Sequence, residues 1–190
     1  MPPEGWSAVR AVADASIRSF SGTAWRVHWR EIGPTDWRLS LRSSGRYHRG
    51  LDLFPADQAF PALYTSLSQE NAIWEMVRRS AARNLAYLKN NVLSELVVDL
   101  GRVLDLSDPS AVGLVLADLT SSDLQLCQEL AAAAMALRAE GMLVPSAALP
   151  GLNLVILPQN LLEPPSLQIL RSTELPLETI AGERPEGGQS

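Results

Sequence analysis

A chain of 190 residues, 46% of them hydrophobic, can bury one ordinary core, so we expect a single folded domain with tails. The formal net charge of -5 and the pI near 5.1 argue against direct binding to nucleic acid, because proteins that bind it present a basic face. No apolar run reaches the roughly 18 residues of a membrane helix, and the N-terminus lacks the pattern of a signal peptide, so we expect a cytoplasmic protein with no membrane contact.

The chain is poor in residues that bind metals through sulfur or imidazole. Cys127 is its only cysteine, which excludes an internal disulfide and a cysteine-based zinc site. The two histidines, His28 and His48, lie on separate segments and are too few to form a metal site. We therefore expect no metal, a small buried group at Cys127, and polar surface or supporting roles for the histidines.

The N-terminal segment, residues 5–20, is predicted to form an amphipathic helix that docks on the domain. Its apolar side chains recur at three- and four-residue spacing from Trp6 to Phe20. Ser21 and Gly22 would end this helix.

A strand with a cationic face is predicted directly after it. Residues 24–30 alternate, with tryptophans and Val27 on one face and Arg26, His28 and Arg30 on the other. A turn at 33–36 leads to a second short strand expected at 37–41.

The middle of the chain predicts a loop, a strand and a helix in succession. Residues 51–61 contain two prolines and no clear period, which indicates an irregular loop. An apolar strand is expected at 62–66, and the following helix starts with a sequence that fits a capping box from Ser66 to Gln69. Glu75 lies on the shoulder of the apolar stripe of this helix, where a carboxylate is either a surface group or a residue at the lip of a pocket.

The second half of the chain predicts further strands and one long helix. Residues 92–106 are expected to form one bent strand, or two strands broken near Gly101. A helix is expected at 122–140, capped by Ser121 or Ser122 and ended by Gly141. A hairpin of 142–149 and 152–157 follows, and then a last strand within 166–177. This alternation indicates an α+β fold with a mixed β-sheet core and flanking helices. Residues 1–172 would form the domain and 173–190 a mobile tail.

Several short motifs carry a resemblance to a known family. They are Arg26 in the first strand, Gly45-Arg46-Tyr47, Leu63-Tyr64-Thr65-Ser66 leading to Glu75, and Val144-Pro145-Ser146 followed by Asn153. In this order, from Arg26 to Gln159, the motifs resemble the RES domain family, the toxins of RES–Xre toxin–antitoxin pairs. Tyr47 stands where the family usually has tryptophan, and Ser44 and His48 replace a common glycine and a common asparagine.

The resemblance implies a fold similar to that of ADP-ribosyltransferase toxins and the degradation of NAD+ by cleavage of its nicotinamide–ribosyl bond. It implies catalytic roles for Arg46, Glu75 and Ser146, and a dinucleotide site formed by Arg26, Arg46, Tyr47, Tyr64, Glu75, Ser146 and Asn153. Water or inorganic phosphate would accept the ribosyl group, with no metal. The implied partner is an Xre-like antitoxin that binds DNA itself. The oligomeric state is left open, and a homo-oligomer is possible.

The chemistry of these residue types agrees with those roles. A carboxylate such as Glu75 stabilises an oxocarbenium-like state, and arginines such as Arg26 and Arg46 offer paired donors to a diphosphate. Tyr64 can stack on a flat ring, and Ser146 can hydrogen-bond the nicotinamide amide or a ribose hydroxyl. Two alternatives stay open: an ADP-ribosyltransferase that modifies a protein with the same pocket, and a non-enzymatic interaction module.

Overall fold

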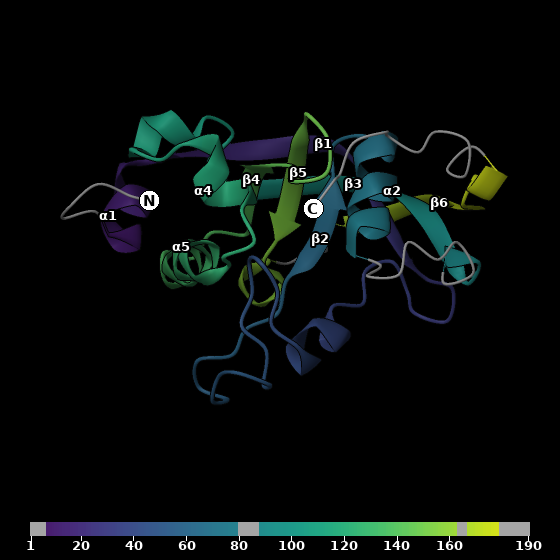
Figure 1. Ribbon diagram of the computed structural model, residues 1–190, viewed down its shortest axis with the longest axis horizontal. Coiled ribbons are helices and arrows are strands. Elements are labelled where there is room, and N and C mark those ends of the chain that lie inside the picture. The colour runs from purple at the N-terminus through teal and green to yellow at the C-terminus, as the bar shows by residue number, and fades with distance from the viewer. Residues whose placement is uncertain (1–6, 80–87, 163–166, 179–190) are drawn as a thin grey trace.

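A mixed, six-stranded sheet forms the centre of the molecule (Figure 1). The computed structural model describes residues 7–79, 88–162 and 167–178. The strands are β1 (Ser16–Trp29), β2 (Leu63–Ser66), β3 (Asn91–Asp105), β4 (Gly141–Pro145), β5 (Leu152–Ile156) and β6 (Leu167–Glu174). The helices are α1 (Ala8–Asp14), α2 (Gln69–Arg79), α4 (Leu116–Thr120) and α5 (Gln125–Ala136), with short 3-10 turns η1 (Arg38–Arg42), η2 (Pro109–Val112) and η3 (Pro158–Asn160).

The sheet is built on a long antiparallel ribbon of β1 and β3. The two strands pair from Ser16 opposite Asp105 to Trp29 opposite Asn91. β4 runs parallel to the end of β3, while β5 is antiparallel to both β4 and β2. This arrangement confirms the predicted α+β class with a mixed sheet, including the hairpin of β4 and β5.

Helices cover the two ends of the sheet and bury its apolar side chains. α1 and α5 pack on one core, in which Leu104, Leu130 and Met142 are fully buried. α2 packs at the other end of the sheet, where Ile73 and Val27 belong to one buried apolar cluster. Figure 1 shows α1, α4 and α5 gathered at one end and α2 at the other. None of the helices in the described part of the chain is long and apolar enough to cross a membrane.

The predicted helix at 5–20 is wrong in its second half. α1 ends at Asp14, and β1 begins two residues later at Ser16. Ile17 pairs with Leu104 of β3, so the pairing between distant strands overrides a local spacing that also fits a helix. Val9, which was expected on the docking face, is 68% exposed.

Two further local predictions fail for identifiable reasons. The predicted strand at 37–41 is instead the 3-10 turn η1 with Trp37 as its N-cap, and both the N–H and the hydroxyl of Ser40 donate to the Trp37 carbonyl. The long helix is shorter than 122–140, because Arg138 adopts a left-handed φ of 58° after α5. Gly141 then opens β4 instead of ending a helix.

The region predicted as one bent strand or two strands forms a single strand, β3, which is irregular near Gly101, where the bend or break was expected. The register against β1 shifts there, and the carboxylate of Glu140 accepts hydrogen bonds from the N–H groups of Gly101 (2.6 Å) and Arg102 (2.9 Å). At the C-terminal end, β6 continues to Glu174 and Leu175 is buried, so ordered structure extends past residue 172. Most of the predicted tail, 179–190, lies outside the described residues.

Candidate active site

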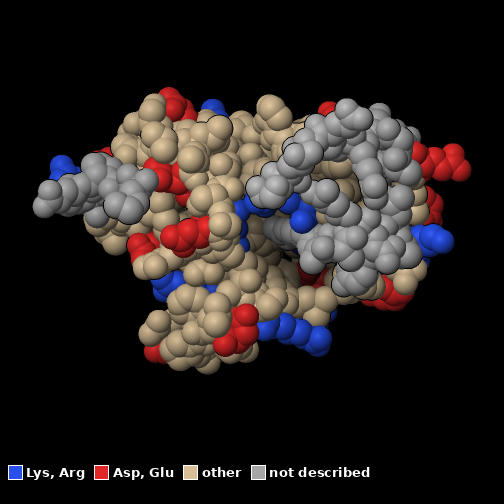
Figure 2. Space-filling view, viewed as in Figure 1, with Lys and Arg blue, Asp and Glu red and all other residues tan. Residues whose placement is uncertain are grey.

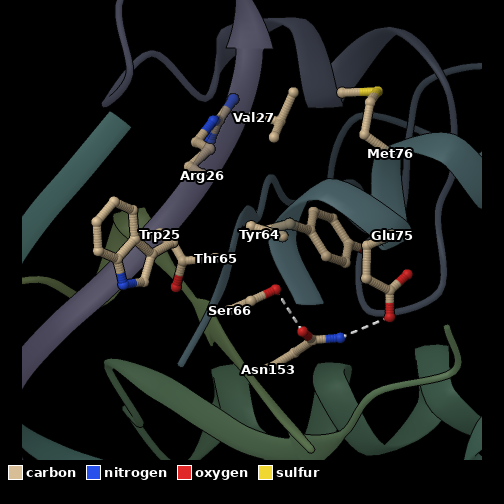
Figure 3. A pocket seen from close by; sticks show the side chains of 10 residues that line it. Trp25, Arg26, Val27, Tyr64, Thr65, Ser66, Glu75, Met76 and Asn153 are labelled. Atoms are coloured by element: carbon tan, nitrogen blue, oxygen red, sulfur yellow. Dashed lines mark hydrogen bonds between the residues drawn. The ribbon is translucent and has the colours of Figure 1, made fainter. Parts of the chain in front are cut away.

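Two adjoining hollows lie between β1, β2 and α2. The smaller, of about 40 Å³, is lined by side chains that include Arg26, Tyr64, Glu75 and Asn153 (Figure 3). The larger, of about 620 Å³, shares Arg26 and Tyr64 with it and is also lined by Arg46. Figure 2 shows basic side chains around a hollow in the middle of one face of the molecule. The hollows therefore bring together residues that are far apart in the sequence.

The carboxylate of Glu75 is held in place by three donors on one of its oxygens. Its Oε1 accepts hydrogen bonds from the Ser146 hydroxyl (2.9 Å), the Ala147 N–H (3.1 Å) and the Asn153 side-chain amide (2.8 Å). All three come from the β4–β5 hairpin, and Oε2 points away from Asn153 (Figure 3). The orientation of the carboxylate is thus fixed by the sheet rather than by α2 alone.

The supporting residues of Glu75 are themselves fixed by strand register. Ser66 ends β2 directly opposite Asn153 of β5, and its hydroxyl donates to the Asn153 side-chain oxygen at 2.6 Å. The predicted capping role of Ser66 is therefore wrong, and the hydroxyl of Ser68 caps α2 instead by accepting the N–H of Asn71. Ser66 was not among the predicted site residues, although its place at the end of a strand directly before the helix could have indicated it.

Ser146 makes its hydrogen bonds within this unit. Its hydroxyl donates to Glu75 and accepts the N–H groups of Ala148 (3.1 Å) and Leu149 (3.5 Å). The residue is buried. In this geometry Ser146 positions Glu75, and its proton is already committed to the carboxylate.

Arg26 reaches both hollows from β1. Its guanidinium donates to the backbone carbonyl of Asp36 at 3.2 Å. The Asp36 carboxylate in turn accepts hydrogen bonds from the side chain and then the backbone N–H of Arg38, which lower the pKa of Asp36 from 3.8 to about 2. Arg26 and Asp36 therefore both line the larger hollow, as a cation and an ionised carboxylate.

Arg46 and Tyr47 are neighbours in sequence but occupy different environments. Arg46 lines the larger hollow and donates to the Leu119 carbonyl at 3.0 Å, with the Cys127 sulfur 3.9 Å away. The Tyr47 side chain is only 2% exposed and lies in the core, where burial raises the pKa of its hydroxyl well above 10.0. The structure thus brings Arg46 to the cleft and places the Tyr47 side chain elsewhere, contrary to the expected ligand contact.

Tyr64 forms a wall that both hollows share. Its hydroxyl oxygen accepts the backbone N–H of Tyr47 at 2.8 Å and lies 2.8 Å from Nδ1 of His48. His48 was expected to be a polar surface or supporting residue, and at 6% exposure it is a buried supporting one.

A comparison of sequences identifies the family of this domain. The family model described as "RES domain" matches residues 23–178. The chain belongs to the RES domain family. This confirms the resemblance drawn from the motifs, and every predicted site residue lies inside the matched stretch.

A solved structure supports the fold of this RES domain independently. A chain in the crystal structure of the M. tuberculosis MbcT–MbcA toxin–antitoxin complex is 28% identical, with a TM-score of 0.77. The match covers 95% of this chain and 97% of that chain, and the matched chain is the MbcT toxin. No curated protein matches the chain. Within the described residues of the RES domain, no three His, Cys, Asp or Glu side chains are grouped so as to hold a metal ion.

Proposed function

We propose that this RES-domain protein is a toxin that degrades NAD+ by breaking the bond between nicotinamide and ribose. The observation that carries the proposal is the fixed carboxylate of Glu75, which faces a hollow also lined by Arg26 and Tyr64. A preorganised negative charge of this kind stabilises the positive charge that develops on a ribose during cleavage, because it needs no reorganisation at that moment.

The reaction balances without a redox partner. The bond between the ribose C1′ and the nicotinamide nitrogen breaks, and its electron pair stays on nicotinamide, which leaves as a neutral molecule. An oxygen of water or of inorganic phosphate then bonds to C1′ and loses a proton. The products are nicotinamide and either ADP-ribose or its phosphorylated form.

The arginines suit the diphosphate of the dinucleotide. Arg26 and Arg46 both line the larger hollow, which adjoins the smaller one at Arg26 and Tyr64. Guanidinium groups offer planar, paired donors to phosphate oxygens. We therefore assign the nicotinamide end of NAD+ to the Glu75 hollow and its diphosphate to the larger hollow.

Product analysis tests the proposal directly. The purified chain, freed of any bound protein, is incubated with NAD+ with and without phosphate, and the products are identified by mass spectrometry. We expect nicotinamide release, and a loss of at least about 100-fold in rate for Glu75→Gln, the magnitude typical of removing one preorganised charge. Glu70→Gln is the matched control, because Glu70 is exposed in the first turn of the same helix. NAD+ left intact by the wild-type chain in both buffers would refute the proposal.

The same experiment separates hydrolysis from transfer to a protein. With NAD+ labelled in its adenylate part, we expect the label in free ADP-ribose or its phosphorylated product. Label bound to a macromolecule would instead identify an ADP-ribosyltransferase that uses the same hollow.

We further propose that a protein antitoxin of the Xre type covers this cleft. A similar solved structure is that of a toxin–antitoxin complex, and the acidic chain itself, with a net charge of -5, is poorly suited to DNA. Co-expression with the cognate antitoxin should restore growth and yield a stable complex. Glu75→Gln should remove toxicity while the variant still co-purifies with the antitoxin, which separates loss of catalysis from loss of folding.

A further inference from the structure

A chain of hydrogen bonds joins Ser43, His48 and Tyr64, which all line the larger hollow. Nε2 of His48 lies 2.7 Å from the carbonyl oxygen of Ser43, which can only accept a hydrogen bond, so the ring proton is on Nε2. In the neutral ring Nδ1 is then an acceptor, 2.8 Å from the Tyr64 hydroxyl. Because Nδ1 carries no proton in this tautomer, the Tyr64 hydroxyl donates to it, while the Tyr64 oxygen accepts the Tyr47 N–H.

This contact is tightly built. His48 is buried, and its ring meets the Tyr64 ring edge to face, with centroids 5.6 Å apart. A Cβ atom on Gly45 would come within 2.7 Å of Nδ1 of His48 and 3.0 Å of the Tyr64 hydroxyl oxygen. Gln128 holds the Gly45 carbonyl from α5 at 2.9 Å. The glycine therefore leaves the room that the histidine and the tyrosine need to approach each other.

The contact fixes two parts of the cleft together. The Tyr64 ring is the wall shared by both hollows, and the Tyr47 N–H that bonds its oxygen directly follows Arg46 in the chain. One phenol oxygen thus ties β2 to the segment that carries Arg46. His48 determines where the proton of that oxygen points.

We propose that His48 is a positioning residue for the dinucleotide site: through Nδ1 it holds the Tyr64 hydroxyl, and so the Tyr64 ring and the Arg46 backbone, in the arrangement that binds substrate. This inference rests on the proposed NAD+-degrading function. It assigns the Tyr64 hydroxyl a supporting role, and leaves the ring face as the part of Tyr64 that meets the ligand.

Two substitutions at position 48 test the hydrogen bonds of Nδ1 and Nε2 separately. His48→Asn can place an amide oxygen where Nδ1 lies and keep an acceptor for Tyr64, whereas His48→Gln can keep a donor to the Ser43 carbonyl but loses that acceptor. We expect His48→Asn to keep a KM for NAD+ close to wild type. We expect His48→Gln to raise KM about five- to tenfold with little change in kcat, because one hydrogen bond that supports binding is lost.

A double-mutant cycle with Tyr64→Phe tests whether the two residues act through one contact. Tyr64→Phe removes the hydroxyl and keeps the ring, so it should raise KM to a similar extent, and adding His48→Gln should cause little further change. Equal KM values for His48→Gln and wild type, or fully additive effects in the double variant, would overturn the inference.

The unfolding free energy provides a readout that needs no substrate. The wild type, His48→Gln, Tyr64→Phe and the double variant are unfolded in urea. We expect the two substitutions to lower the unfolding free energy by less together than the sum of their separate effects, and a fully additive loss would count against the contact. If the wild-type chain itself leaves NAD+ intact, the proposed function fails, and this cycle still decides whether His48 holds Tyr64. If the wild-type chain is active and His48→Gln matches it, only the inference fails.

Discussion

Ser146 donates its hydroxyl proton to Oε1 of Glu75 across 2.9 Å, although 71 positions separate the two residues in the sequence. The bond joins the loop after β4 to α2, and the Ala147 N–H and the Asn153 amide add to it on the same oxygen. The candidate catalytic carboxylate is therefore oriented by a hairpin that the sequence places far from it.

Removing the Ser146 hydroxyl should weaken catalysis more than folding. Ser146→Ala leaves Glu75 with two of its three described Oε1 donors, and we expect kcat/KM for NAD+ to fall about tenfold, as for the loss of one hydrogen bond to a charged group. The rate of nicotinamide release measures this. Ser121→Ala, at an exposed serine between α4 and α5, is the control and should behave as wild type. An unchanged rate for Ser146→Ala would show that the hydroxyl does not support Glu75 during the reaction.

Glu140 should be required for stability rather than for activity. Its carboxylate satisfies the N–H groups of Gly101, Arg102 and Leu162, and the residue is buried. Glu140→Ala leaves these groups without their partner, so we expect a loss of about 3 kcal/mol in unfolding free energy, measured in urea. Glu31→Ala, at an exposed position, should change it little. A loss for Glu140→Ala no larger than that for Glu31→Ala would contradict this assignment.

The stability of the protein should fall in mild acid partly because of His28. Burial lowers the pKa of His28 below 6.5, so below that pH the unfolded chain binds a proton that the folded chain does not yet take up. The contribution of His28 to stability is thus complete above pH 6.5 and is lost as the pH falls toward the lowered folded-state pKa. Urea unfolding at about pH 7.5 and about pH 5.5 should show a smaller decrease for His28→Gln than for wild type. Equal decreases would show that His28 does not contribute.

Gly45→Ala should disturb the cleft, whereas Gly33→Ala should not. A Cβ at Gly45 would press on the ring of His48 and come within 3.0 Å of the Tyr64 hydroxyl oxygen, while a Cβ at Gly33 would meet nothing within 4 Å. We expect Gly45→Ala to lower both the thermal midpoint and the rate of NAD+ loss, because the ring of His48 must move. The Gly33→Ala variant should keep both values. If the two variants are equally active and stable, the close approach at Gly45 carries no function.

The sequence was sufficient to predict those elements whose signals lie within the segment that forms them. The hairpin of β4 and β5 and the position of Glu75 on a helix after β2 could be predicted, because turn residues and apolar periodicity lie within each segment. The boundary between α1 and β1 could not, since the side chains from Ser16 onward fit two periods and only pairing with β3 decides between them.

The candidate site shows the same limit at the level of single residues. Arg26, Arg46 and Glu75 were assigned to the cleft from the family resemblance, and the structure brings all three to the hollows. Tyr47 was assigned with them, but its side chain points into the core. The contact of His48 with Tyr64 was not predictable, because it depends on a backbone carbonyl and a phenol oxygen that only the folded chain brings together.

The hairpin between β4 and β5 also limits how this protein can vary in length. Ser146 and Asn153 flank a short reversal closed by the Ser146 N–H on the Gly151 carbonyl, and both hold the same carboxylate oxygen. One inserted or deleted residue there would move two anchors of Glu75 out of register. Residues 53–59, by contrast, line neither hollow and supply no bond to Glu75 among the described contacts, so insertions should be tolerated in that loop and not in the reversal.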